Sequence, residues 1–211
     1  MIIDLSHYIE EGMPVYPGTE PPDIKVVMSY EQFGFKESRI QIFSHVGTHL
    51  DCPAHIYPDG LSVANMPIDQ FCGSGLVLDS SELGSHALID TSFISRFNNL
   101  ITNKDFILFY TAWDKKWGSS AYFEDYPTFT EEAIKYLAQM QIKGIGIDAI
   151  SIDPVDENQL NNHRIFLQSQ KIIIENLKDI DTLIGKDFEF MCFPLKLQNG
   201  DGSPIRAVAV L

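Results

Sequence analysis

One segment of eleven residues, HVGTHLDCPAH, concentrates side chains that can bind a metal or transfer a proton. It holds His45, His49, Asp51 and His55, which include three of the six histidines in this chain of 211 residues. Two neutral imidazoles and a carboxylate suit a divalent transition metal such as zinc or manganese, and three protein ligands leave one position open for water or substrate. A metal lowers the pKa of its bound water to about 7, and His55, whose ordinary pKa is ~6.5, is suited to moving a proton. The pattern therefore favours a hydrolytic metal site over a chance cluster.

The spacing within this segment favours an extended backbone. On a helix, His45 and His49 would share a face and Asp51 would point away from both. On an extended chain the side-chain period is two, so these odd-numbered residues can face one side. Gly47 weakens a helix by roughly 1 kcal/mol, and Pro53 weakens it by roughly 3 kcal/mol. We therefore predict an irregular loop that leaves a strand and lets the imidazoles and the carboxylate converge.

The elements expected to position this loop are mostly strands, because short apolar or alternating runs outnumber helical patterns. Strands are predicted over residues 2–5, 23–30, 38–44, 75–79, 105–110, 144–148, 171–175, 188–193 and 206–211. Helices are predicted over residues 90–100, after a Thr130 N-cap, over 162–168 and over 179–184. Segment 38–44 alternates as a half-buried strand would and leads the chain to His45. Helices that fall between strands predict an α/β fold with a mixed β-sheet, in one domain spanning residues 1–211.

Composition excludes several classes of partner. Hydrophobic residues make up 45% of the chain and charged residues 21%, as in an ordinary globular protein. The net charge of −14 argues against a nucleic-acid surface and disfavours an anionic membrane. The N-terminus lacks the features of a signal peptide, and no apolar run approaches the ~20 residues of a membrane helix. Three cysteines without a CxxC pair predict free thiols and a cytoplasmic location, and Cys52 is interpreted as a packing residue rather than a thiolate ligand.

Other candidate residues are ambiguous when each is taken alone. His163 and Glu175, which ends the apolar run KIII, are each more typical of structural residues. Asp148 and Asp153 in GIDAISIDP could orient histidines or could form turns. Three aromatic residues could line a pocket or belong to the core: Trp113, Trp117 and Tyr122.

The segment from His45 to His55 matches the motif HxGTHxDxPxH, and in this the chain resembles the cyclase-like metal-dependent hydrolases. That family includes bacterial kynurenine formamidases and isatin hydrolases. The resemblance extends over nearly the whole chain, through MPVYPG, TAWDKKWG, GIDAISIDP and FPLKLQNGDGSPIR. It implies a swivelling β/β/α-type fold and a homo-oligomer, either a dimer or a tetramer.

The resemblance also implies roles for individual residues. His45, His49 and Asp51 would bind one metal, with Asp51 bridging to a second. His163 would bind the second metal, and Glu175 would bridge or ligate. The ions would be one or two Zn²⁺ per chain, or one Mn²⁺ as in isatin hydrolases, where Gln replaces the residue at position 175. Glu175 therefore favours the formamidase type.

The expected activity is hydrolysis of a small aromatic amide. The best single candidate is N-formyl-L-kynurenine, cleaved to kynurenine and formate by metal-bound hydroxide, with His55 as general acid and base. Tyr16 stands where the family usually has a Trp that contacts the substrate. One alternative is a lactam or lactone hydrolase that uses one manganese, as isatin hydrolases do. Another is a metal-binding or small-molecule-binding protein without catalysis.

Overall fold

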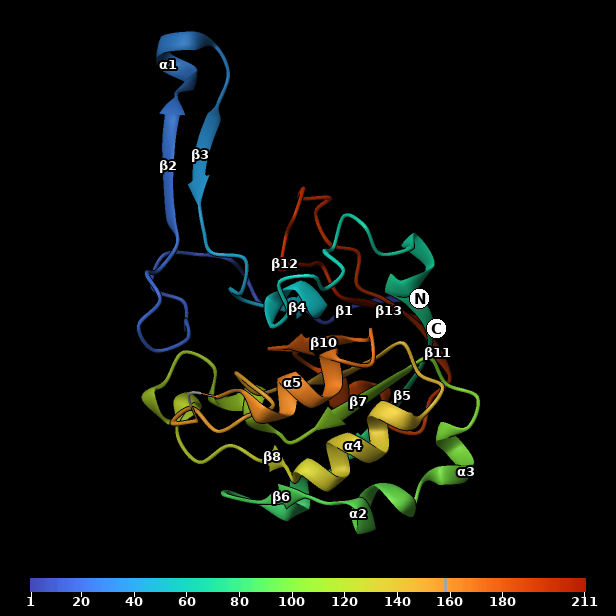
Figure 1. The fold of residues 1–211 in the computed structure, drawn as a ribbon. Helices are drawn as coiled ribbons and strands as arrows, with labels where there is room; N and C mark the ends of the chain where they lie inside the picture. The colour runs from blue at the N-terminus through green and yellow to red at the C-terminus, as the bar shows by residue number, and fades with distance from the viewer. Residues whose placement is uncertain (158) are drawn as a thin grey trace.

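A nine-stranded sheet forms the centre of the computed structural model, which describes residues 1–157 and 159–211 (Figure 1). In spatial order its strands are β1 (Ile2–Asp4), β13 (Val208–Val210), β11 (Phe188–Met191), β5 (Cys72–Asp79), β7 (Phe106–Tyr110), β9 (Gly144–Ile147), β10 (Ile172–Glu175), β4 (His49–Asp51) and β12 (Gly202–Pro204). The four central strands β5, β7, β9 and β10 run parallel, and the strands outside them pair antiparallel. The predicted α/β class with a mixed sheet is confirmed.

The central strands are buried on both faces, which explains their nearly continuous apolar sequences. In β7, Ile107 and Phe109 pack into one hydrophobic cluster, while Phe106 and Leu108 pack into a second cluster on the opposite face. The first cluster includes buried residues of the helices, most of which are drawn below the sheet in Figure 1. These helices are α2 (Thr91–Ser95), α3 (Asn98–Ile101), α4 (Glu131–Gln139) and α5 (Asn161–Leu167).

Short elements complete the body. A parallel pair is formed by β6 (Leu88–Ile89) and β8 (Thr128–Phe129). The 3₁₀ helices are η1 (Pro53–His55), η2 (Ile68–Phe71), η3 (Ser81–Leu83), η4 (Trp113–Lys116), η5 (Ser120–Phe123) and η6 (Ile180–Leu183). In the described part of the chain, no helix has the length and apolar character needed to cross a membrane.

Local sequence signals explain several element boundaries. The Thr130 side chain accepts a hydrogen bond of 3.1 Å from the Ala133 N–H, so it caps α4 as predicted. Asp90 caps α2 in the same way, at 2.8 Å from the Phe93 N–H. The single helix predicted over residues 90–100 is instead two short helices, because the backbone leaves the helical conformation at Phe97. The helix predicted over 179–184 is the 3₁₀ helix η6.

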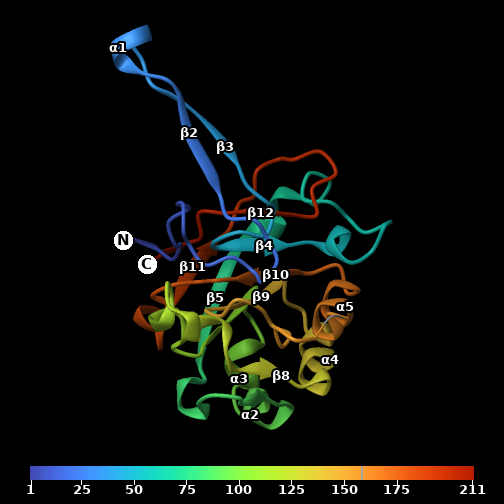
Figure 2. The same ribbon diagram turned by 90° about the vertical axis from the view of Figure 1, so that its left-hand side faces the viewer.

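An extended hairpin projects away from the body in both ribbon views (Figures 1 and 2). It consists of β2 (Asp23–Met28), α1 (Tyr30–Phe33) and β3 (Glu37–Gln41), and we call residues 23–41 the arm. Every residue of β3 is exposed, so the predicted half-burial of this strand is wrong. Ile40, the apolar residue of β3, is exposed because the strand projects away from the body.

Candidate metal centre

Two neighbouring antiparallel strands bring three of the predicted ligands together. In the register of β4 and β10, His49 lies opposite Glu175, and Asp51 lies opposite Ile173. His49 and Asp51 share one face of β4, because side chains two residues apart in a strand point the same way. A strand therefore occupies residues 49–51, where we predicted an irregular loop, and the predicted period of two holds within it.

Glycines allow His45 to approach this pair. Gly47 has a φ of +60°, in the left-handed region that glycine adopts at little cost. Its carbonyl accepts hydrogen bonds of 2.8 Å from the ring Nδ1–H of His49 and from the side chain of Asn176. On the other side, a Cβ at Gly202 would lie 2.6 Å from Cε1 of His45. A glycine at position 202, the first residue of β12, therefore leaves room for the His45 ring.

His163 enters the site from the first turn of α5, held by Asp153. One carboxylate oxygen of Asp153 accepts from the backbone N–H of Asn162 at 2.9 Å. The other oxygen accepts from the backbone N–H of His163 at 3.1 Å and from its ring Nδ1–H at 2.7 Å. Of the two roles considered for Asp153, orientation of a histidine is therefore the one that the geometry supports.

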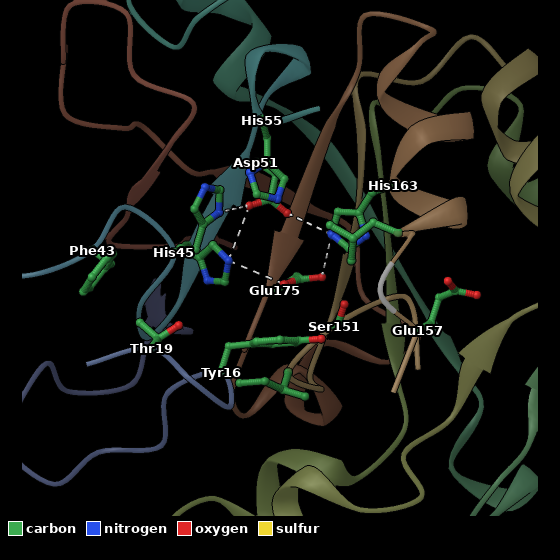
Figure 3. Close-up of a pocket in the computed structure, with 13 residues that line it drawn as sticks. Tyr16, Thr19, Phe43, His45, Asp51, His55, Ser151, Glu157, His163 and Glu175 are labelled. Carbon is green, nitrogen blue, oxygen red and sulfur yellow. Dashed lines mark hydrogen bonds and ion pairs between the residues drawn. The ribbon is translucent and has the colours of Figure 1, made fainter. Parts of the chain in front are cut away.

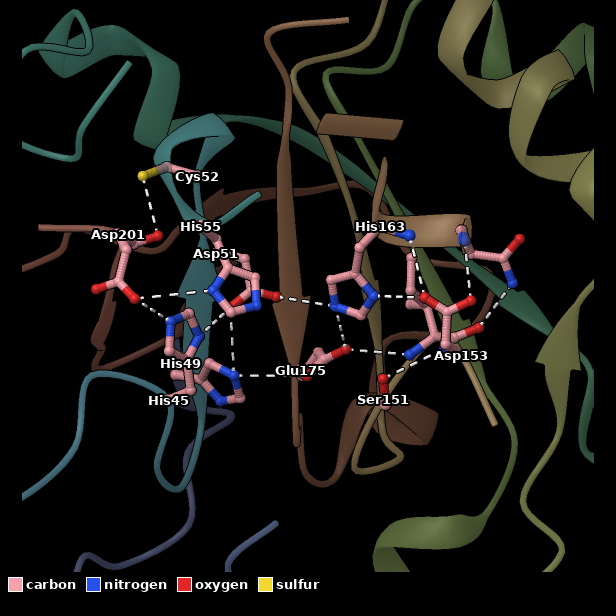
Figure 4. A network of polar contacts seen from close by, with 12 residues as sticks. His45, His49, Asp51, Cys52, His55, Ser151, Asp153, His163, Glu175 and Asp201 are labelled. Carbon is pink, nitrogen blue, oxygen red and sulfur yellow. Dashed lines mark hydrogen bonds and ion pairs between the residues drawn. The ribbon is translucent and has the colours of Figure 1, made fainter. Parts of the chain in front are cut away.

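The remaining ring nitrogens of His49 and His163 point at the same two carboxylates, those of Asp51 and Glu175 (Figure 4). Nε2 of His49 lies 3.4 Å from Asp51 Oδ1 and 3.5 Å from Glu175 Oε2. Nε2 of His163 lies 3.3 Å from Asp51 Oδ2 and 3.2 Å from Glu175 Oε1. Asp51 thus belongs to two groups of potential metal ligands, one with His45 and His49 and one with His163 and Glu175.

These residues fit a divalent metal. Ligand atoms 2.0–2.2 Å from a tetrahedral ion are ~3.4 Å apart, which is close to the four separations just given. Asp51 Oδ2 is buried and has no hydrogen-bond partner among the described residues, which is costly unless a cation compensates it. Because Nδ1 of both His49 and His163 is engaged elsewhere, each Nε2 is left free to coordinate.

The electrostatics of the site also call for positive charge. Burial disfavours the charged form of His49, but the nearby charges and hydrogen bonds of Asp51 and Glu175 outweigh it and raise its pKa to about 10. Burial likewise opposes charge on His45, yet Asp51 and Asp201 raise its pKa to about 9. Burial by itself raises the pKa of the Asp51 carboxyl, but the neighbouring imidazoles outweigh it and hold this pKa well below its usual range. A metal would replace the protons on these histidines.

His55 lies at the edge of the cluster beside the carboxylate of Asp201, a residue far from the histidine motif in sequence. Asp201 Oδ2 is 2.9 Å from Nε2 of His45 and 3.7 Å from Nδ1 of His55. Asp201 precedes β12, whose register places Gly202 opposite Asp51. The only sequence signal for Asp201 is its place in the segment FPLKLQNGDGSPIR, which was noted without assigning a role to its carboxylate.

A cavity of about 330 Å³ opens onto these residues (Figure 3). The polar residues that line it include His45, His49, Asp51, His55, His163 and Glu175. Tyr16, Phe43, Ile150 and Leu160 supply apolar wall surface. The Tyr16 hydroxyl donates to the Val155 carbonyl at 3.1 Å, which fixes the ring against the cavity.

Several other candidates lie outside this cavity. Asp148 accepts hydrogen bonds from Thr111 and Trp113 and orients no histidine. Trp113 and Tyr122 are buried in the first hydrophobic cluster, the one that contains the helix residues, so they belong to the core rather than to the cavity wall. Cys52 is buried with its thiol 3.0 Å from the Asp201 carbonyl, and burial raises its thiol pKa to about 11, as expected of a packing residue.

Comparison with known proteins assigns the chain to a family. The model of the Cyclase family, described as "Putative cyclase", matches residues 3–154. Kynurenine formamidase of Bacillus cytotoxicus is 29% identical over 98% of this chain and 95% of its own length. An isatin hydrolase bound to the product analogue thioisatinate has a TM-score of 0.89 at 23% identity, covering 100% of this chain and 92% of its own. A structure described as a "potential metal-dependent hydrolase with cyclase activity" has a TM-score of 0.81 at 27% identity, covering 99% of this chain and 98% of its own. The chain therefore belongs to the Cyclase family.

Proposed function

We propose that this protein is a metal-dependent hydrolase of non-peptide C–N bonds, with an aryl formamide as substrate. The observation that carries the proposal is Asp51, a buried carboxylate with one imidazole Nε2 near each of its oxygens, at 3.4 and 3.3 Å. The full-length similarity to kynurenine formamidases supports N-formyl-L-kynurenine as the substrate, with kynurenine and formate as products.

His45, His49 and Asp51 would hold one metal, while His163 and Glu175 would hold a second that shares Asp51. A bound divalent metal supplies a Lewis acid that polarises the formyl carbonyl and makes water acidic enough to react at neutral pH. The chain's own residues set the site in advance: the Gly47 carbonyl fixes the His49 ring, and Asp153 fixes that of His163. Zinc and manganese both accept this donor set, and zinc is our prediction.

His55 would transfer the proton in the reaction. It lines the cavity, and its side chain is partly exposed, so it can reach a bound substrate. As water adds to the formyl carbon, His55 takes its proton, and it then gives this proton to the aniline nitrogen as the C–N bond breaks. Asp201, 3.7 Å from Nδ1 of His55, would favour the charged imidazolium between these two steps.

The apolar walls would select the substrate. Tyr16 and Phe43 present aromatic rings to the cavity, and a flat aniline can stack on such surfaces. Tyr16 is our proposed substrate contact. A cyclic amide such as isatin would present a similar flat ring, so it is the appropriate competing substrate.

The test combines elemental analysis with a substrate panel. Protein purified without added metal is expected to contain one or two divalent ions per chain. It should hydrolyse N-formyl-L-kynurenine and formanilide faster than isatin. The opposite preference with one manganese per chain would support the isatin-hydrolase alternative. Retained metal without turnover of any amide would support a non-catalytic binding protein.

His55→Ala separates catalysis from metal binding. Loss of a general acid and base typically lowers turnover by 10²–10⁴-fold, so we expect a decrease of about that size. The metal content should stay at the wild-type value. Undiminished turnover at full metal content would remove the proposed role of His55.

A further inference from the structure

Asn176, which follows the proposed ligand Glu175, has an unusual backbone conformation. Its φ is +57°, in the left-handed region that few residues other than glycine adopt, although Asn tolerates it better than most. The residue is only 2% exposed, so it does not belong to a surface turn. A buried residue keeps such a conformation only where the surrounding contacts hold it there.

Two residues of the histidine motif that lie outside the proposed ligand set contact Asn176. The side-chain NH₂ group of Asn176 donates to the Gly47 carbonyl at 2.8 Å. The Thr48 hydroxyl donates to the backbone carbonyl of Asn176 at 2.6 Å. Asn176 therefore ties the end of β10, which carries Glu175, to the segment that enters β4 at His49.

The Gly47 carbonyl connects Asn176 with a proposed metal ligand. This oxygen also accepts from the ring Nδ1–H of His49 at 2.8 Å, so one atom receives both donors. The two donor nitrogens, His49 Nδ1 and Asn176 Nδ2, lie 3.4 Å apart. A hydrogen bond from one ring nitrogen fixes the orientation in which the other nitrogen faces a metal. Asn176 thus holds the acceptor that in turn holds the His49 ring.

Tyr122 determines which way the amide of Asn176 is turned. The fully buried hydroxyl of Tyr122 donates to Oδ1 of Asn176 at 2.6 Å. Burial raises the pKa of this hydroxyl well above its ordinary value, so it stays protonated and can donate. A backbone carbonyl can only accept, so the amide must present its NH₂ group to Gly47 and its oxygen to Tyr122.

We propose that Asn176 is a positioning residue of the metal site, which holds the His49 ring through the Gly47 carbonyl, and that Tyr122 acts through Asn176. The inference rests on the metal centre of the proposed function but not on any particular substrate. Without the Asn176 amide, the Gly47 carbonyl would lose one of its two donors and would hold the His49 ring less firmly. Nε2 of His49 would then be less well placed to coordinate a metal.

Asn176→Gly tests the side chain separately from the backbone, because glycine adopts a φ of +57° at little cost. With the full-length protein and cobalt(II) as the probe, the variant should bind the ion about 10–100-fold more weakly in competition with a chelator. The visible absorption bands of the bound ion should also shift, because they depend on the geometry of its ligands. Asn199→Gly is the matched control: Asn199 has a φ of +58° but is exposed, so its replacement should change neither readout.

Tyr122→Phe removes only the hydroxyl that orients the amide. This variant should weaken cobalt(II) binding as well, but by less than Asn176→Gly does. Added to Asn176→Gly, it should have no further effect, because two residues that act through one contact are not additive. Far-UV circular dichroism verifies that each variant is folded.

A cobalt(II) affinity and spectrum of Asn176→Gly equal to those of Asn199→Gly would overturn the proposal, and so would additive losses in the double variant. If Asn176→Gly does not fold, an unchanged affinity and spectrum in Tyr122→Phe would overturn it instead. Neither readout depends on turnover. Wild-type protein that binds cobalt(II) with the expected differences among variants, but hydrolyses no amide, would contradict the proposed function and leave the role of Asn176 intact.

Discussion

Asp153 shows how one residue outside the ligand set can control the site. Its carboxylate receives the Nδ1–H of His163 at 2.7 Å and so aims Nε2 at Asp51 and Glu175. Asp153→Asn keeps the shape but removes the negative charge that makes the imidazole a stronger ligand. We expect the affinity for metal to fall 10–100-fold, measured by competition with a chelator.

Asp148→Asn is the matched control for that experiment. Asp148 is a buried carboxylate in the same segment, but it bonds to Thr111 rather than to a histidine. Its replacement should leave the metal affinity unchanged. Equal affinities in both variants and the wild type would show that Asp153 does not act through His163.

We predict that the Asp148 carboxyl makes the free energy of unfolding depend on pH. Burial raises its carboxyl pKa from 3.8 to about 7, against hydrogen bonds from Thr111 that act to lower it. Between pH 3.8 and about 7, the Asp148 carboxyl keeps its proton in the folded state and has lost it in the unfolded state. The free energy of unfolding therefore falls as the pH rises through this range, by up to about 4 kcal/mol. Relative to the wild type, Asp148→Asn should gain stability between pH 4 and 7. Chemical denaturation that gives a constant difference over this range would contradict the prediction.

At the residue scale, the sequence is most informative where the ligands are close together. His45, His49, Asp51 and His55 fall in one segment and could be selected by type and spacing. His163 and Glu175 lie more than a hundred residues away, so only the family resemblance connected them to the segment. Asp201 was missed because an acidic residue in a glycine-rich turn has an equally good structural explanation.

At the element scale, the packing of β12 against β4 decides where His45 can sit. A Cβ at Gly202 would lie 2.6 Å from His45 Cε1 and 2.7 Å from the Leu50 carbonyl oxygen. Gly202→Ala must therefore displace the ring or separate the strands, at a cost of about 1–3 kcal/mol in the free energy of unfolding. Metal content should fall as well, because one ligand is displaced.

Gly185→Ala is a suitable comparison for that variant. Among the described residues, no atom lies within 4 Å of a Cβ built at Gly185, although its φ of +72° strains a side chain. This variant should lose stability by thermal unfolding and keep its metal. Full metal occupancy in Gly202→Ala would show that the close contact with His45 is not needed.

Elements buried on both faces were the most predictable. The apolar runs of β7 and β10 fall within one residue of their predicted bounds, because few other structures accommodate such sequences. Segment 38–44 alternates like a half-buried strand, but the residues of it that form β3 are exposed, since a sequence pattern does not say what lies against a strand. The strand β4 was not predicted, because its pairing partners β10 and β12 are distant in sequence.

At the scale of the whole molecule, the mixed sheet turns a dispersed set of residues into one site. The strand order places β10 and β12 on either side of β4, so two segments from near the end of the chain flank the histidine motif. Helix α5 then brings His163 over the same edge (Figure 4). The acidic charge of the chain, −14, adds to the attraction of this site for a divalent cation.

The central claim is that Asp51 and its neighbours bind the catalytic metal. Anomalous X-ray diffraction at the absorption edge of the metal retained on purification tests it most directly. We predict a peak ~2.0–2.2 Å from a carboxylate oxygen of Asp51 and from Nε2 of His49 or His163. A metal located elsewhere in the chain, with these side chains bonded only to one another, would contradict the account.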